Sequence, residues 1–130
     1  MGTDVSHYIY ISMPKHSKIG MNGEQIAVDF LTNKGYNIVF RNWRTGKKEV
    51  DIVASKGDVL VFVEVKTRSK NILQFPEEAV GHRKQEALRV AAGTFLEQYT
   101  AYRSVRFDIV SVLLNDEHAR EIVHFEEAFH

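Results

Sequence analysis

The sequence predicts an α/β domain, with helices packed on a mixed, partly antiparallel sheet in the order α-β-β-β-α-β-β. Two observations support this. Short runs rich in β-branched and aromatic residues alternate with two longer segments of helical periodicity. Turn residues around Gly46 and Gly57 separate three successive strands. With 130 residues, 44% of them hydrophobic and 26% charged, the chain is large enough for one domain with its own core.

Residues 1–18 are interpreted as a leader or disordered segment, which leaves residues 19–130 as a single domain. Alternatively, residues 7–11 pair as an edge strand. The segment lacks a basic stretch followed by an apolar core, so we expect no signal peptide. No stretch approaches the ~20 apolar residues of a membrane span. The absence of cysteine excludes disulfides and thiolate metal sites, and we expect a cytoplasmic protein.

The first helix is predicted from about Gly23 to Lys34. Asn22 can cap it, Gln25 can complete a capping box, and Gly35 suits the position after its C-terminus. The residues that face inward at helical spacing are Glu24, Ile26, Ala27, Val28, Phe30 and Leu31. Glu24 therefore begins a core-facing stripe. It is either an acid favoured by the helix dipole or part of a functional site.

A three-stranded meander is predicted next, over residues 36–42, 47–54 and 59–66. A tight turn between the second and third strands pairs Ala54 with Val59. In that register Asp51 lies opposite Phe62. Phe62 and Glu64 share one face because side chains alternate along a strand. Asp51 is therefore expected diagonally beside Glu64, roughly 7–8 Å away at the backbone.

The second helix is predicted from about Glu77 to Tyr99, with Pro76 at its start. Its inward stripe comprises Val80, Ala87, Leu88, Ala91, Phe95 and Gln98. Lys84 falls on the same stripe. It either lays its stem along the edge of the core or faces the charged end of the sheet. Two further strands are predicted, over residues 105–114 and 121–125.

Charge is balanced in total but unevenly distributed. The 17 basic and 17 acidic residues give zero net charge, which argues mildly against a strongly basic nucleic-acid binder. Between residues 34 and 48 all charged residues are basic: Lys34, Arg41, Arg44, Lys47 and Lys48. The tail is mostly acidic, with Asp116, Glu117, Glu121, Glu126 and Glu127 against Arg120. The pattern indicates either a polarised molecule or two solvated surface runs.

The last strand of the meander carries charges that a buried strand does not normally hold. Its sequence VLVFVEVK places Glu64 and Lys66 among β-branched residues. An ionised side chain there is unfavourable unless it is paired or binds a metal. Asp51 and Glu64 can converge on one divalent cation, and a third carboxylate from Glu24 suits Mg²⁺ or Mn²⁺. Lys66 could orient a water molecule or stabilise developing negative charge, as metal-assisted phosphodiester hydrolysis requires.

The basic turn of the meander would hold phosphates through Arg41, Arg44, Lys47 and Lys48. Trp43 in the same turn either stacks on a base or packs in the core.

The three acids and the lysine resemble the motif of the PD-(D/E)xK nuclease superfamily. Glu24 lies on the first helix, followed by Asp51 and then by Glu64-Val65-Lys66. More narrowly, residues 20 to 114 resemble the YraN family of bacterial proteins, akin to the archaeal Holliday junction resolvases. The motifs that carry the likeness are GxxGExxA from Gly20, Gly35-Tyr36, RNWR from Arg41, EVDIVA from Glu49, VFVEVKTR from Val61, PxEAV from Pro76, Lys84 and RFD from Arg106. Val50 stands where the superfamily motif has its proline.

The resemblance implies a restriction-endonuclease-like core and a divalent-metal-dependent DNA endonuclease, with branched or junction DNA as the candidate substrate. It implies catalytic roles for Glu24, Asp51, Glu64 and Lys66. The implied ligands of Mg²⁺ or Mn²⁺ are Glu24, Asp51, Glu64 and the Val65 carbonyl. We expect nucleic-acid contacts from Arg41, Asn42, Arg44, Arg68 and Lys84. The loop of residues 69–75 is expected to be mobile without DNA.

Two other interpretations fit the sequence. A nucleic-acid-binding module of the same fold without turnover would suit the zero net charge, although a carboxylate cluster repels phosphate. Alternatively, Glu64 and Lys66 form a structural ion pair at a strand end. The resolvase relatives imply a homodimer, and the apolar residues Phe125 and Phe129 are candidates for its surface.

Overall fold

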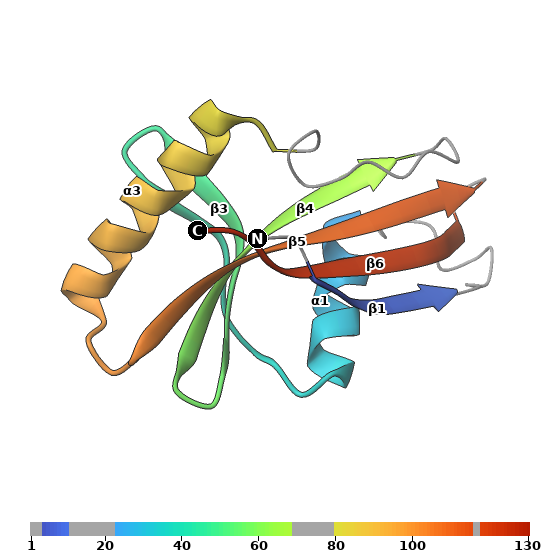
Figure 1. Ribbon diagram of the computed structural model, residues 1–130, viewed down its shortest axis with the longest axis horizontal. Coiled ribbons are helices and arrows are strands. Elements are labelled where there is room, and N and C mark those ends of the chain that lie inside the picture. The colour runs from blue at the N-terminus through green and yellow to red at the C-terminus, as the bar shows by residue number, and fades with distance from the viewer. Residues whose placement is uncertain (1–3, 11–22, 69–79, 116–117) are drawn as a thin grey trace.

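The computed structural model describes residues 4–10, 23–68, 80–115 and 118–130. The predicted α/β class and mixed sheet are confirmed. The elements are β1 (Asp4–Tyr10), α1 (Gly23–Asn33), β2 (Asn37–Thr45), β3 (Lys48–Lys56), β4 (Val59–Arg68), α3 (His82–Gln98), β5 (Ser104–Asn115) and β6 (His118–Phe129) (Figure 1). Neither of the described helices is long and apolar enough to cross a membrane.

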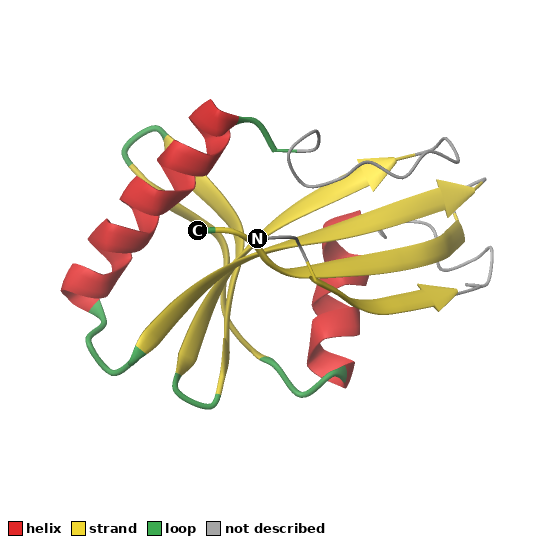
Figure 2. Cartoon of the chain, viewed as in Figure 1, coloured by secondary structure: helices red, strands yellow, loops and turns green. Residues whose placement is uncertain are grey.

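The six strands form one sheet in the order β1-β6-β5-β4-β3-β2. Neighbouring strands are antiparallel except β4 and β5, which are parallel. Helix α3 lies in the crossover between these two strands, because parallel neighbours cannot be joined by a hairpin. The two helices cover opposite faces of the sheet (Figure 2). On β4, Val61 and Val63 pack with residues of α1, whereas Leu60 and Phe62 pack with residues of α3.

Strand β1 forms one edge of the sheet, paired with β6. Asp4–Tyr10 is therefore a strand in the structure, while the interpretation of residues 1–18 as a leader stays a prediction. The alternative, an edge strand, is observed there, and it begins at Asp4 rather than at His7. Asn22, Pro76 and the loop of residues 69–75 lie outside the described residues.

The β3–β4 hairpin is tighter than predicted. Lys56, not Ala54, pairs with Val59, which leaves Gly57 and Asp58 as a two-residue turn. Gly57 has φ of 63°, and such two-residue turns match the twist of the flanking strands. The observed register differs from the predicted register by two residues. Because this is an even number, every side chain stays on its predicted face.

Helix α1 ends as predicted, whereas α3 begins later. After α1, Gly35 has φ of 95°, and the amides of Gly35 and Tyr36 donate to the carbonyls of Thr32 and Leu31. These two hydrogen bonds define a glycine-terminated helix end. The predicted start of α3 at Glu77 is wrong for the described residues before His82. Val80 and Gly81 are not helical there, and Gly81 is extended.

Three smaller predictions are corrected. Gln98, predicted to face inward from α3, is exposed. Strand β2 continues through Thr45, so the turn that follows is formed by Gly46 and Lys47. Phe125 and Phe129 are only 2% and 9% exposed, because they pack in the core under α3, so they cannot form a dimer surface. The homodimer itself stays a prediction.

Candidate functional site

Asp51 on β3 and Glu64 on β4, here called the carboxylate pair, meet where their strands separate. Backbone pairing between β3 and β4 ends at Ile52 and Val63. Beyond that point the Val65 N–H donates to Asp51 Oδ2 at 2.9 Å. A carboxylate thus takes the place of a backbone carbonyl at the end of the ladder. Figure 1 shows the end of β4 running away from β3.

Glu64 is buried without a full set of partners. Its side chain lies in the core-facing row of β4 and the residue is 6% exposed. Burial and the neighbouring Asp51 carboxylate raise the pKa of Glu64 to about 7, against the opposing effects of Lys84 and Lys66. Among the described residues, Glu64 Oε1 is the one buried side-chain oxygen or nitrogen that lacks a hydrogen bond. An oxygen in this condition can accept a cation without losing an existing hydrogen bond.

Two lysines lie beside the carboxylate pair. Lys84, in the first turn of α3, places its Nζ 3.8 Å from Glu64 Oε1. Of the two alternatives for Lys84, the structure therefore favours the one in which it faces the charged end of the sheet. Lys66 is half-buried on the same face of β4 as Glu64, and its charge lowers the pKa of Glu64. The ion-pair partner of Glu64 within the described chain is Lys84 rather than Lys66.

Glu24 is held by β2 and is not gathered with the carboxylate pair. Asn42 Nδ2 donates to Glu24 Oε1 at 3.0 Å, and Arg41 Nη2 lies 3.6 Å from the same oxygen. Across the part of the chain that the structure describes, no three acidic or histidine side chains form a group that could hold a metal. The site as observed is therefore two carboxylates, with the third acid at the N-terminus of α1.

The N-terminus of α1 is pressed against the end of β4. A Cβ atom at Gly23 would lie 1.8 Å from Thr67 Oγ1, so any larger residue would require Thr67 or the helix to shift. Thr67 directly follows Lys66 in the sequence. The first turn of α1, which carries Glu24, is thus docked one residue beyond the lysine of the site.

The remaining predicted residues lie around this centre. Arg44 pairs with Glu49 at 3.4 Å and has a largely exposed side chain. Arg68 is half-buried at the end of β4. Trp43 packs edge-on against Phe95 with ring centroids 5.1 Å apart, so it belongs to the core rather than to a base-stacking surface.

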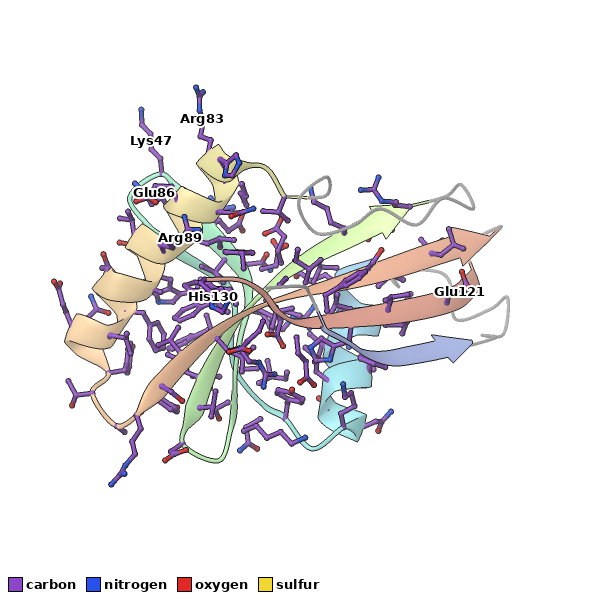
Figure 3. The ribbon with its side chains drawn as sticks, viewed as in Figure 1. Lys47, Arg83, Glu86, Arg89, Glu121 and His130 are labelled. Carbon is purple, nitrogen blue, oxygen red and sulfur yellow. The ribbon has the colours of Figure 1, made fainter. Side chains whose placement is uncertain are left out.

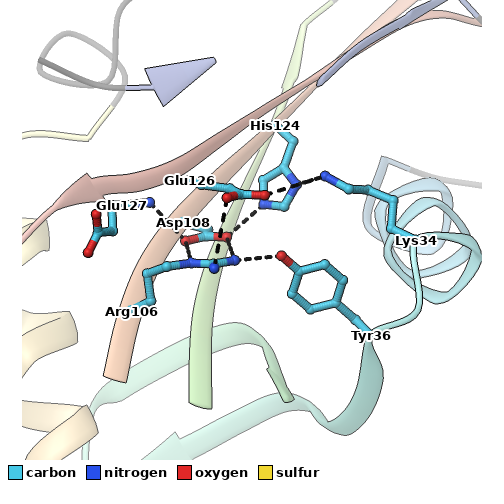
Figure 4. Close-up of polar contacts among 7 residues, drawn as sticks. All are labelled: Lys34, Tyr36, Arg106, Asp108, His124, Glu126 and Glu127. Atoms are coloured by element: carbon cyan, nitrogen blue, oxygen red, sulfur yellow. Dashed lines mark hydrogen bonds and ion pairs between the residues drawn. The ribbon is translucent and has the colours of Figure 1, made fainter. Parts of the chain in front are cut away.

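A second polar cluster, which the sequence analysis missed, lies on the face of the sheet that α1 covers (Figure 4). Its members, here called the Asp108 cluster, are Lys34, Tyr36, Arg106, Asp108, His124, Glu126 and Glu127. Asp108 accepts hydrogen bonds from Arg106 Nε at 2.9 Å, Arg106 Nη2 at 2.8 Å and the Glu127 N–H at 3.1 Å. His124 Nε2 lies 2.6 Å from Asp108 Oδ2.

The Asp108 cluster is electrostatically satisfied. Burial alone would raise the pKa of Asp108, but the hydrogen bonds from His124 and Arg106 outweigh it, so this pKa is lowered. His124 Nδ1 lies 2.6 Å from Lys34 Nζ. Desolvation lowers the pKa of Lys34, with partial compensation from Glu126. The signal for this cluster was present in the sequence, because Arg106 and Asp108 flank a phenylalanine in an otherwise apolar strand.

Comparison with known proteins places these motifs in one family. The family model described as "Uncharacterised protein family UPF0102" matches residues 23–112. A UPF0102 protein of Porphyromonas gingivalis is 43% identical over 118 residues, which cover 90% of this chain and 87% of that protein. A UPF0102 protein of Phocaeicola vulgatus is 39% identical, covering 91% and 97% of the two chains. A UPF0102 protein of Rhodococcus opacus is 40% identical, covering 90% and 100%.

Among solved structures, that of Pyrococcus furiosus SfsA in complex with Ca²⁺ was compared with this chain. It is 14% identical in sequence, with 79% of this chain and 60% of that chain covered and a TM-score of 0.27. A similarity this low says nothing about fold or function. The resemblance seen in the sequence motifs is confirmed by the family match and by the relatives: the chain belongs to the uncharacterised protein family UPF0102, the YraN family.

Proposed function

We propose that this protein is a divalent-metal-dependent DNA endonuclease that hydrolyses phosphodiester bonds, with branched or junction DNA as its substrate class. The observation that carries the proposal is the carboxylate pair. Asp51 meets a buried Glu64 at a point where two strands separate, and two ammonium groups lie beside them. The nuclease resemblance of the family motifs supports the same activity and a restriction-endonuclease-like core.

The donor set fits a hard cation. Asp51, Glu64 and the Val65 carbonyl offer oxygen ligands, which Mg²⁺ and Mn²⁺ prefer, and Glu24 would complete the set directly or through water. The Glu64 oxygen without a hydrogen bond is the position that a cation would fill. When bound, such a cation polarises a phosphoryl oxygen and lowers the pKa of a coordinated water molecule.

The lysines would act on the substrate. Lys66, next to the carboxylate pair, would orient the attacking water or stabilise the negative charge that develops on the phosphoryl group. Lys84 pairs with Glu64 in the free protein. A cation bound at Glu64 would repel its ammonium group, which would then be available for a DNA phosphate.

Backbone phosphates would be held by basic side chains of the strands, of the β2–β3 turn and of α3. Arg44 and Arg68 are the candidates on the strands. Figure 3 shows Lys47 and Arg83 projecting outward from the β2–β3 turn and from the first turn of α3, and both side chains are exposed. Arg83 is the one phosphate candidate among these four that the sequence analysis did not propose.

The test is cleavage of branched and linear DNA by the purified protein with Mg²⁺ or Mn²⁺. We expect Asp51→Ala and Glu64→Ala each to lower the rate at least about 100-fold, because metal activation contributes several kcal/mol to the transition state. Glu49→Gln is the matched control, since this acid lies on the same strand but pairs with Arg44. Unchanged cleavage in either alanine variant would overturn the assignment.

A nucleic-acid-binding module without turnover is the second candidate. The observation that favours it is the engagement of Glu24 by Asn42 and Arg41, which leaves two acids at the site among the described residues. DNA binding that is independent of divalent cations, together with no affinity for Mn²⁺, would establish this function in place of the first.

A further inference from the structure

Asn42 lies in line with the carboxylate pair. The β2–β3 register pairs Arg41 with Ile52, which places Asn42 across from Asp51. The β3–β4 register, continued by one residue past Ile52, places Asp51 across from Glu64. The residue that donates to Glu24 therefore occupies the same row of the sheet as the two acids of the site.

The backbone at Asn42 has an unusual conformation for a strand. Its φ of 53° lies in the left-handed region, which is unfavourable for a residue other than glycine and which asparagine tolerates better than most. Successive side chains of a regular strand point to opposite faces. Here both Arg41 and Asn42 reach Glu24, so the distortion brings two adjacent side chains to one carboxylate.

The helix that carries Glu24 is held on two sides. Gly23 is in tight contact with Thr67 at the end of β4. On the other side, Arg41 Nη1 donates to Gln25 Oε1 at 2.8 Å. Because the first turn of α1 is fixed in this way, Glu24 would change its partner by rotation of its side chain, without movement of the helix.

The ion pair between Arg41 and Glu24 is one that a DNA phosphate can compete with. The Arg41 side chain is 39% exposed and lies 3.6 Å from Glu24, so the two form a solvent-accessible ion pair. Such pairs contribute little to stability. A phosphate group can accept two parallel hydrogen bonds from one guanidinium, which makes it a strong competitor for Arg41.

We propose that Arg41 and Asn42 form a latch on Glu24 that a DNA phosphate opens. The inference rests on the proposed function and concerns how its metal site is completed. In the free protein the latch keeps Glu24 away from Asp51 and Glu64. A backbone phosphate that binds Arg41 releases Glu24, which then joins the cation held by the carboxylate pair. Arg41 and Asn42 are thus positioning residues, and DNA and cation each strengthen the binding of the other, since coupling between sites is reciprocal.

The first experiment is a calorimetric Mn²⁺ titration of the full chain without DNA. Arg41→Gln should raise the affinity for Mn²⁺ roughly threefold, because it frees Glu24 from an exposed ion pair. Asn42→Gly should act in the same direction, since glycine keeps the left-handed backbone while the amide donor is lost. Arg44→Gln is the matched control: Arg44 lies on the same strand but pairs with Glu49, and the variant should leave the affinity unchanged.

A double variant separates release of Glu24 from a general loss of positive charge. In a Glu24→Gln background, Arg41→Gln should no longer change the Mn²⁺ affinity. In a Lys66→Ala background, which keeps DNA intact, a short DNA duplex should raise the Mn²⁺ affinity more when Arg41 is present than when it is replaced.

The outcomes distinguish the latch from the metal site. Equal effects of Arg41→Gln and Arg44→Gln, or an Arg41→Gln effect that persists without Glu24, would overturn the latch and leave the metal site standing. Absence of Mn²⁺ binding by the unmodified protein, with and without DNA, would overturn the proposed function and the latch together.

Discussion

Two buried carboxylates lie on opposite faces of the same sheet and differ in how fully their oxygens are hydrogen-bonded. Asp108, fully buried on the α1 face, is satisfied by Arg106, His124 and a backbone N–H, and its pKa is lowered. Glu64, buried on the α3 face, has one oxygen without a hydrogen bond to any described residue, and its pKa is raised to about 7. At Asp108 the burial of charge is outweighed by hydrogen bonds, whereas at Glu64 the nearby Lys84 and Lys66 only partly offset burial and the Asp51 charge.

The difference separates an acid that is part of a stabilising network from an acid whose environment fits the proposed metal site. An acid whose hydrogen bonds are all made inside the protein stabilises the native state as part of a network. An acid that the fold buries but does not satisfy lowers stability, and such groups concentrate at functional sites. Three predictions test this difference between Asp108 and Glu64.

The largest effect is expected at Asp108. We expect Asp108→Asn to lower the free energy of unfolding by about 3–5 kcal/mol, because Arg106 and His124 lose a buried charged acceptor. Urea denaturation with an unchanged slope would measure it. The substitution is nearly isosteric, so little of the loss would come from a cavity. A loss below about 1 kcal/mol would show that the Asp108 cluster does not stabilise the fold.

The same acid-to-amide change at Glu64 should have the opposite sign. The folded-state pKa of Glu64 lies above its unfolded value of 4.5, so the folded protein holds the proton more tightly. Its contribution to stability is therefore fully present below pH 4.5 and is lost as pH rises toward 7. In metal-free buffer at pH 8, Glu64→Gln should raise the free energy of unfolding by something on the order of 3 kcal/mol, and near pH 4 the gain should vanish.

The measurement is a pair of urea unfolding series across pH 4 to 8, with a chelator present, for the original protein and for Glu64→Gln. Only their difference reports on this group, because all other titrating groups are shared. A difference that does not grow with pH would contradict the only partly compensated burial of Glu64.

The sequence carried the signal for both acids, but not the distinction between them. Glu64 and Lys66 in a β-branched run predicted a site, and the error of two residues in the hairpin register kept Asp51 on the correct face. Arg106 and Asp108 give the same pattern on β5. Whether a buried charge is satisfied depends on donors from distant elements, here His124 of β6, and those contacts have no local signature.

Glu24 on α1 shows the same limit of prediction from sequence. The periodicity of α1 and its glycine end were predictable, because both follow from local chemistry. The partner of Glu24 was not, because it depends on the left-handed backbone of Asn42 within a strand. The start of α3 was also predicted wrongly. Pro76 indicated an early start, but the chain is still extended at Gly81.

The smallest effect is expected where α1 joins the two regions. Its N-terminus touches the end of β4 through Gly23, while Lys34 just beyond its C-terminus belongs to the Asp108 cluster. Gly23→Ala would place a Cβ 1.8 Å from Thr67 Oγ1. Either the Thr67 side chain or the helix must then shift at that end. We expect the free energy of unfolding to fall by about 2 kcal/mol, as for other overpacked contacts.

Two controls test that reading of Gly23. Gly93→Ala on α3 meets no atom within 4 Å and should instead stabilise the protein by about 0.5–1 kcal/mol. Adding Thr67→Ala to Gly23→Ala removes the nearest atom and should recover part of the loss. Because the strain acts on the site end of the helix, NMR signals of Arg41 and Asn42 should shift while the ring signals of His124 stay in place. Shifts of equal size at His124 would mean that α1 transmits changes between the two regions as a rigid body, and that the carboxylate pair and the Asp108 cluster are coupled.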